Sequence, residues 1–302
     1  IAGISFPFSL AKQREKGVRE RSIYTKVIRR GLTLVALGLV YNGLFNLDFA
    51  TLRLPSVLGR IGLAWMFAAM LFIRFGIRTR IALAAVILVG YGLLLQFVAA
   101  PDAAGAGPLT EAGNIVGYID RTIMPTHLYG NRGFDPEGLL STLPAIVTAM
   151  LGMFTGEFVR RSEEQISGSR KALRMAAGAA LLLVLALCLD PLQPVNKKLW
   201  TPAFVFAAGA YSLGMFALFY YIIDVRQWRR WSYFFQVIGL NSITIYMVQR
   251  IVRVSYTSEF FFGGLGSKFS PEVASVIFSA GYISVCWLLL WFLDRKKIYL
   301  KV

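Results

Sequence analysis

Long apolar runs dominate the chain and are separated by short polar connections. The runs are about 20 residues long, which at about 1.5 Å per residue is enough to cross a hydrocarbon core of about 30 Å. Apolar and polar residues do not alternate within them, as they would in β-barrel strands. We therefore predict an all-α, polytopic transmembrane helical bundle. It has eight complete spans, at 31–49, 55–75, 80–100, 139–159, 172–190, 201–223, 234–252 and 272–293, after one truncated N-terminal span at 1–9.

The charge pattern supports a membrane protein and gives it an orientation. The net charge is +16, but the basic residues occupy every second connection and do not form one patch, so they do not indicate nucleic-acid binding. The basic connections are 11–30, 74–80, 160–174, 226–230 and 295–301. The positive-inside rule places them in the cytoplasm, which predicts a cytoplasmic C-terminus and outward-facing connections at 50–54, 101–138, 191–200 and 253–270.

One outward connection, 117–138, concentrates the polar chemistry of the chain. It carries Asp120, Arg121, His127, Tyr129, Arg132, Asp135 and Glu137, and His127 is the single histidine of the sequence. Asp135 precedes Pro136, so it fits the N-cap of the next helix as well as a functional site. His127 is either a surface residue or a general base whose pKa is tuned by its neighbours. One histidine and two distant cysteines, Cys188 and Cys286, cannot build a zinc site, so no metal is expected.

Some polar residues elsewhere also need partners. Arg60 lies within a predicted span, where an arginine is costly unless it faces the bundle interior, so it is either a paired structural residue or a functional one. Lys197 and Lys198 lie on the outer side, against the charge pattern, which indicates an anionic partner. Asn241 lies inside a predicted span and either joins helices or binds a ligand.

Six short motifs, in order, resemble a known family. They are L-P-S-V-L-G-R-I-G (54–62), G-Y-I-D-R (117–121), H-L-Y (127–129), D-P-E-G-L-L-S-T-L-P-A-I (135–146), V-N-K-K-L-W-T (195–201) and G-L-N-S-I-T-I-Y (239–246). Together the motifs resemble the transmembrane acyltransferases related to heparan-α-glucosaminide N-acetyltransferase and its bacterial relatives. The resemblance covers nearly the whole chain, so 1–302 is interpreted as a single transmembrane acyltransferase domain.

The resemblance implies transfer of an acetyl group from cytoplasmic acetyl-CoA to the amine of a terminal glucosamine-type sugar outside. It also implies a homodimer in the lipid bilayer, here the bacterial inner membrane. The family's catalytic histidine precedes a span that ends G-x-x-x-P-F-S, which matches Gly3–Ser9. We therefore expect that histidine to lie before residue 1 and the sequence to lack its true beginning.

The hypothesis assigns roles to residues around one outward-facing pocket. Asp135, Glu137 and His127 are the catalytic candidates; Arg60, Asn42, Asn241 and Lys197 are the candidates for binding acetyl-CoA; Asp120, Arg121, Asn196 and Trp200 are the candidates for binding the sugar. The alternatives are an O-acyltransferase for surface glycans, a proton-coupled sugar transporter and a non-catalytic scaffold. A transporter predicts carboxylates deep within the spans, whereas here they gather at the outer rim.

Overall fold

The computed structural model describes residues 3–103, 105–131, 133–162, 164–266 and 268–300. Regular structure within these ranges is helical, and the β pairing found there is one isolated bridge between Ala99 and Asn114. The predicted all-α class is therefore confirmed. The chain divides into two compact units, Ile1–Arg226 and Gln227–Val302.

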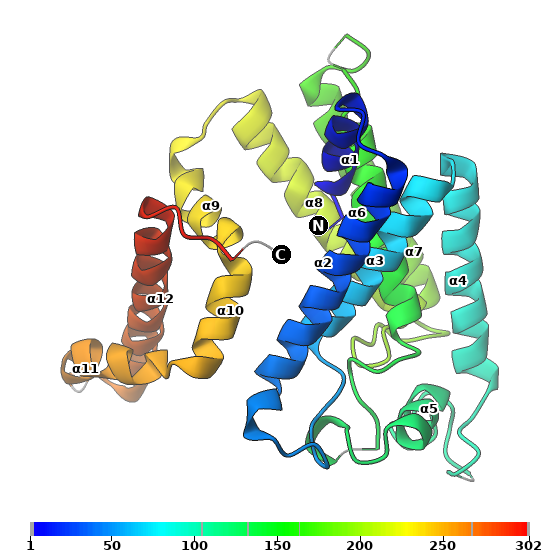
Figure 1. The fold of residues 1–302 in the computed structure, drawn as a ribbon, viewed down its shortest axis with the longest axis horizontal. Helices are drawn as coiled ribbons and strands as arrows, with labels where there is room; N and C mark the ends of the chain where they lie inside the picture. The colour runs from blue at the N-terminus through cyan, green and yellow to red at the C-terminus, as the bar shows by residue number, and fades with distance from the viewer. Residues whose placement is uncertain (1–2, 104, 132, 163, 267, 301–302) are drawn as a thin grey trace. The chain divides into compact units, whose positions relative to one another are not determined.

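The first unit contains the helices that frame the polar loops (Figure 1). They are α1 (Phe6–Glu15), α2 (Glu20–Tyr41), η1 (Leu44–Asn46), α3 (Val57–Arg74), α4 (Ile77–Phe97), α5 (Ile115–Ile123), η2 (Tyr129–Asn131), α6 (Thr142–Val159), α7 (Gly168–Leu189), α8 (Pro202–Tyr220) and its continuation η3 (Tyr221–Val225). The main packed pairs are α2 with α3, α3 with α6, and α7 with α8.

The second unit contains η4 (Arg230–Ser232), α9 (Tyr233–Leu240), α10 (Ser242–Ile251), α11 (Val254–Gly266) and α12 (Pro271–Arg295). Helix α12 packs on α11 and α9. Trp287 of α12 stacks on Phe234 of α9 at 5.5 Å between ring centroids, and its indole N–H donates to the Phe234 carbonyl. A Cβ at Gly281 would overlap the ring of Phe262, so glycine permits the close crossing of α11 and α12.

Six helices in the described ranges are long and apolar enough to cross a membrane, which indicates a multi-pass membrane protein. They are Val57–Arg74, Ile77–Phe97, Thr142–Val159, Gly168–Leu189, Pro202–Val225 and Pro271–Arg295. The predicted count of eight complete spans and one truncated span is not confirmed. Helix α2 ends at Tyr41 and takes in the basic stretch from Glu20, and the predicted span 234–252 breaks at Asn241 into two short helices. The predicted span 1–9 overlaps α1 from Phe6, and residues 1 and 2 lie outside the described residues.

The connections of the first unit alternate between its two ends (Figure 1). Segments 42–56, 98–141 and 190–201 gather at one end, here named the polar-loop end. The basic segments 11–19, 74–80 and 160–167 lie at the opposite end. This arrangement follows the alternation of charge along the sequence, and it brings three polar segments from distant parts of the chain together.

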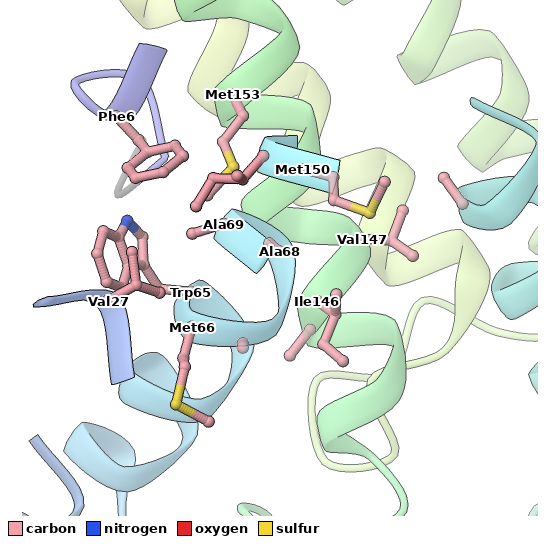
Figure 2. Packing of buried hydrophobic residues seen from close by; sticks show 14 of the residues in the cluster. Phe6, Val27, Trp65, Met66, Ala68, Ala69, Ile146, Val147, Met150 and Met153 are labelled. Atoms are coloured by element: carbon pink, nitrogen blue, oxygen red, sulfur yellow. The ribbon is translucent and has the colours of Figure 1, made fainter. Parts of the chain in front are cut away.

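The core between α1, α3 and α6 holds the helices that carry these loops (Figure 2). Phe6 of α1 contacts Trp65 of α3 edge-to-face at 5.5 Å, and Met150 and Met153 of α6 are buried in the same cluster. A Cβ at Gly62 would come within 2.7 Å of Leu34, so the α2–α3 crossing needs a small residue there. Close packing of this kind fixes the positions of the helix ends at the polar-loop end.

Side-chain caps start two of the helices that enter from that end. Ser56 accepts a hydrogen bond from Gly59 N at 2.9 Å at the start of α3, and Thr201 accepts one from Phe204 N at 3.3 Å at the start of α8. The capping interpretation of Asp135 is wrong, because α6 begins at Thr142 and the 135–138 segment is a separate turn before it.

Candidate active site

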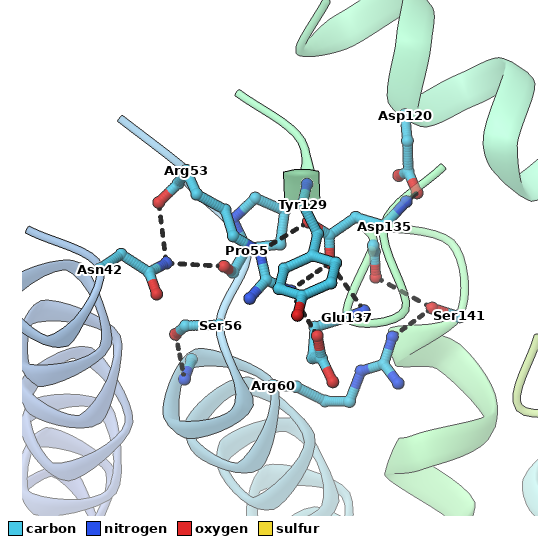
Figure 3. Close-up of polar contacts among 12 residues, drawn as sticks. Asn42, Arg53, Pro55, Ser56, Arg60, Asp120, Tyr129, Asp135, Glu137 and Ser141 are labelled. Atoms are coloured by element: carbon cyan, nitrogen blue, oxygen red, sulfur yellow. Dashed lines mark hydrogen bonds and ion pairs between the residues drawn. The ribbon is translucent and has the colours of Figure 1, made fainter. Parts of the chain in front are cut away.

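A cluster of charged residues joins the segment before α3 to the turn before α6 (Figure 3). Arg53 binds Asp135 with both ends of its guanidinium, Nε to Oδ2 at 2.8 Å and Nη2 to Oδ1 at 2.6 Å, and Nη2 also binds Glu137. The guanidinium lies over the Tyr129 ring, 4.6 Å from its centroid. Bidentate pairing of this kind fixes orientation as well as charge.

Local bonds hold Arg53 at this place. The amide of Asn42, at the end of α2, donates to the carbonyls of Arg53 and Pro55, both at 2.8 Å (Figure 3). His127 binds the Leu52 carbonyl through Nδ1 at 2.8 Å, and its own carbonyl accepts from Leu54 N. Because a carbonyl only accepts, Nδ1 of His127 carries the hydrogen and Nε2 is the acceptor nitrogen of the neutral ring.

Asp135 is fully buried, and its two oxygens are saturated. Besides Arg53, Oδ2 accepts from Tyr129 N and Oδ1 accepts from Glu137 N, both at 2.9 Å. Four donors leave no lone pair for a substrate proton, so Asp135 is suited to holding the turn together. Glu137 is different, because its side chain is 15% exposed and lines a cavity.

Asp120 of α5 is also fully buried and binds the same turn from the other side. Its Oδ2 accepts from Asp135 N at 3.3 Å and its Oδ1 accepts from Leu139 N at 3.0 Å. Burial raises the pKa of Asp120 to about 6, although these two amide bonds oppose the shift. For Arg53, burial lowers the pKa, but the bonds and charges of Asp135 and Glu137 outweigh it and leave the pKa above its usual value.

Arg60 lies near the start of α3 and is 5% exposed. Its Nη2 donates to the hydroxyl of Ser141 (Figure 3), and its guanidinium lies 4.7 Å from the centroid of the Trp200 ring. Its Nε and Nη1 are buried and have no hydrogen-bond partner among the described residues. Buried donors of a charged group are costly when they are unpaired. These two nitrogens are therefore the groups of the site that most need a hydrogen-bond acceptor from a ligand.

These groups meet at a cavity of about 210 Å³ at the polar-loop end. It is lined by Val57, Arg60, Ile61, Ala64, Trp65, Glu137, Ala145, Thr148, Ala149, Lys197 and Trp200. Pockets that enclose a drug-sized ligand measure about 300–1,000 Å³. The cavity therefore suits a small group, such as an acetyl thioester or part of one sugar, and is too small for a whole nucleotide.

The segment before α8 forms one wall of the cavity. Asn196 Oδ1 accepts from Lys198 N at 2.8 Å and folds the turn, and the Leu199 carbonyl accepts from the Tyr91 hydroxyl. Trp200 has a φ of +54°, which is unusual for a bulky residue. Its indole N–H donates to Thr148 Oγ1 at 3.2 Å, which holds the ring beside Arg60. A strained residue held by such contacts is typical of a binding site.

The structure brings together four of the residues predicted from the sequence and separates others. Arg60, Glu137, Lys197 and Trp200 line the cavity. Asn42, Asp120, Asp135 and Asn196 support the surrounding loops through the bonds above.

Three other predicted residues lie elsewhere or outside what is described. Arg121 pairs with Asp102, Nη2 to Oδ1 at 2.7 Å, away from the cavity lining. Asn241 belongs to the second unit, where it is buried, and its Oδ1 has no partner among the described residues. Arg132, named with the polar loop, lies outside the described residues.

Sequence reasoning missed Arg53, Ser141 and Trp65. Arg53 lies in a predicted outward connection, where a basic residue goes against the charge pattern as Lys197 and Lys198 do. Trp65 lines the cavity, and its buried indole N–H has no partner in the described part of the chain. Nothing in the apolar run around Trp65 distinguishes it from an ordinary core tryptophan.

The residues that line the cavity offer donors and one carboxylate. The described residues contain no group of three or more histidine, cysteine, aspartate or glutamate side chains that could hold a metal ion. Two unpartnered N–H groups of Arg60 can bind a carbonyl oxygen that gains negative charge, and Glu137 can bind an amine. An acyl-transfer reaction requires both elements.

The chain has relatives among proteins of known function. No protein-family model matches the chain. The chain is similar along its full length to heparan-alpha-glucosaminide N-acetyltransferase of Mus musculus, with 23% identity over 358 aligned residues, and to that of Homo sapiens, with 22% over 356. It spans about half the length of these curated relatives, 53% and 52%. These matches confirm the resemblance that the six motifs indicate, and support a relationship between this chain and the heparan-alpha-glucosaminide N-acetyltransferase family.

Proposed function

We propose that this protein is a membrane-embedded N-acetyltransferase that moves an acetyl group from acetyl-CoA to the amine of a terminal glucosamine-type sugar. One observation carries the proposal: a small cavity is lined both by Glu137 and by buried Arg60, whose Nε and Nη1 have no hydrogen-bond partner among the described residues. The relatives' names state N-acetyl transfer, which agrees with this pairing of groups.

In the proposed reaction, the sugar's amine nitrogen attacks the carbonyl carbon of the thioester. The new C–N bond forms, the C–S bond breaks, the amine gives up one proton and CoA leaves as a thiol. The N–H groups of Arg60 bind the carbonyl oxygen while it carries negative charge, which is commonly the largest single contribution to such catalysis. Glu137 holds the amine and accepts its proton. Trp200 lies beside Arg60 and packs against the thioester or the sugar ring.

The remaining predicted roles belong to the same proposal. Lys197, an exposed residue in the cavity lining, binds a negatively charged part of a substrate. The predicted contact of Asn241 with acetyl-CoA stays a prediction. Acetyl-CoA on the cytoplasmic side, the sugar on the outer side, the homodimer, the bacterial inner membrane and the single domain over 1–302 stay predictions from the family resemblance. A catalytic contribution of His127 also stays a prediction.

The test is acetyl transfer by the purified protein in lipid vesicles, with acetyl-CoA and a glucosamine-terminated oligosaccharide. We expect an N-acetylated product and a higher melting temperature in the presence of acetyl-CoA, since a ligand of the native state stabilises it. Glu137→Gln should lower kcat by about 10²-fold or more, in the range of lost acid–base catalysis. Glu111→Gln is the matched control, because Glu111 is exposed and only loosely paired with Lys198 at 3.8 Å.

The outcomes separate the alternatives. An O-acetylated product that is cleaved by mild base would favour the O-acyltransferase. Sugar uptake without acetylation would favour the transporter. If the wild-type protein neither transfers acetyl groups nor is stabilised by acetyl-CoA, the proposal is wrong.

A further inference from the structure

Asp120 is a buried carboxylate whose bonds all go to the main chain of one turn. It is 0% exposed, and its two oxygens accept from Asp135 N and Leu139 N. No lysine or arginine in the described part of the chain lies within ion-pair distance of it. A buried carboxylate without a cation is costly, so these two amide bonds are the main interactions that offset its burial.

The turn fits around this carboxylate with no space to spare. A Cβ added to Gly138 would overlap all three atoms of the Asp120 carboxyl group, so only glycine permits the approach. The Gly138 carbonyl in turn accepts from the hydroxyls of Ser141 and Thr142, at 3.1 and 3.0 Å. The carboxylate of Asp120 therefore lies at the centre of the segment that leads into α6.

The segment carries one residue that lines the cavity and one that contacts Arg60, and the positions of both depend on its shape. Glu137 lies between the two amides that Asp120 binds and lines the cavity. Ser141, two residues beyond the second amide, accepts from Arg60. A shift in the turn would move the carboxylate and the hydroxyl partner of the guanidinium together (Figure 3).

We infer that Asp120 is a positioning residue for acyl transfer: it binds the amides of Asp135 and Leu139 and so sets where Glu137 meets the cavity and where Ser141 meets Arg60. This inference rests on the proposed function. It replaces the direct contact with the sugar that the sequence suggested, because both oxygens are occupied and the side chain is not exposed.

Asp120→Asn tests this role with almost no change in shape. An asparagine presents one oxygen and one NH₂ group, so one of the two amides would face another donor. We expect kcat to fall by about 10- to 100-fold, the loss typical of a displacement of about 1 Å at a reacting group. The KM for acetyl-CoA should change by less than about threefold, since Arg60, Trp200 and Lys197 lie outside the turn, on α3 and in the segment before α8.

Gly138→Ala should produce the same defect from the opposite side of the contact, since its methyl group displaces the Asp120 carboxylate. If Asp120→Asn does not fold, Gly138→Ala alone tests the positioning role. The matched controls are Gly90→Ala, where a Cβ would meet nothing within 4 Å, and Glu111→Gln, which removes an exposed carboxylate. Both controls should keep the wild-type kcat.

A second measurement does not depend on activity. Hydrogen exchange of the amides of Asp135 and Leu139 should be slow in the wild type and at least tenfold faster in Asp120→Asn and Gly138→Ala. If the wild type transfers acetyl groups and both variants keep its kcat and its exchange rates, the positioning role is wrong. If the wild type shows no transfer, the proposed function fails, and hydrogen exchange alone decides whether Asp120 sets the turn.

Discussion

Two buried arginines occupy matching places at opposite ends of the first unit, yet their surroundings differ. Arg60 lies in the first turn of α3 and Arg80 in the first turn of α4, and each is 5% exposed. Each guanidinium lies over an aromatic ring, at 4.7 Å from Trp200 and 3.9 Å from Phe72. In both, Nε and Nη1 have no hydrogen-bond partner within the described ranges.

The difference lies in the third nitrogen. Nη2 of Arg80 donates to the carboxylate of Glu157 at 3.1 Å, whereas Nη2 of Arg60 donates to the neutral hydroxyl of Ser141. Arg60 also lines a cavity, and the carboxylate there, Glu137, is already bound to Arg53. The charge of Arg80 is therefore balanced within the fold, while Arg60 retains the capacity to bind a ligand. Burial alone therefore does not identify an arginine as part of a binding site. The charge of its hydrogen-bond partner distinguishes the two cases.

The largest expected difference is in kcat, when each of the two arginines is replaced by lysine. Lysine keeps the charge but lacks the fixed fork of N–H groups, so Arg60→Lys should lower kcat by about 10²–10³, the cost of losing one oxyanion donor. Arg80→Lys should leave kcat within about twofold of the wild type. Acetyl transfer in vesicles measures both. Equal losses in the two variants would mean that the two arginines do not differ in function.

The next largest expected effect is on stability, and it is at Arg80. Arg80→Met leaves the Glu157 carboxylate without its cation and should lower the free energy of unfolding by about 2–3 kcal/mol, less than for a fully buried pair because the Glu157 side chain is 39% exposed. Adding Glu157→Gln should restore most of that loss. Reversible unfolding in mixed micelles measures the difference. No gain from the second substitution would show that Arg80 does more than pair with Glu157.

Much of the fold could be predicted from the sequence, and the predictions that differ from the structure have local causes. Hydrophobic length and the alternation of basic connections place the six long apolar helices and the polar-loop end. The 234–252 run is apolar enough to be read as one helix, but the backbone turns at Asn241, whose φ and ψ of −119° and 20° end α9. Such a break depends on tertiary packing, which a hydropathy pattern does not contain.

The candidate site was predicted in part. Arg60, Glu137 and Lys197 stand out because each is a charged group where the pattern disfavours one, and all three line the cavity. The sequence does not show that Asp135 is saturated by Arg53, because the two residues are 82 positions apart. Nor does it distinguish Arg60 from Arg80, since the carboxylate that pairs with Arg80 lies on another helix.

The smallest expected effect is a pH dependence of the free energy of unfolding, caused by Asp120 at the polar-loop end. Asp135 of the same turn, Arg60 of α3 and the phenol of Tyr91 on α4 are the titratable or charged groups that act on it. Its pKa of about 6 lies above the usual 3.8, so the folded state favours the neutral acid. The contribution of Asp120 to stability is therefore greatest below about pH 4, falls as the pH rises to about 6, and is constant above that.

Each pKa unit corresponds to about 1.4 kcal/mol, and we expect a measured change on the order of 1 kcal/mol. Unfolding free energies between pH 4 and 7 should show this decline in the wild type and lack it in Asp120→Asn. Arg80→Met, which leaves Asp120 untouched, should keep the decline. The same slope in Asp120→Asn as in the wild type would assign the titration to another group and remove this distinction between the two ends of the unit.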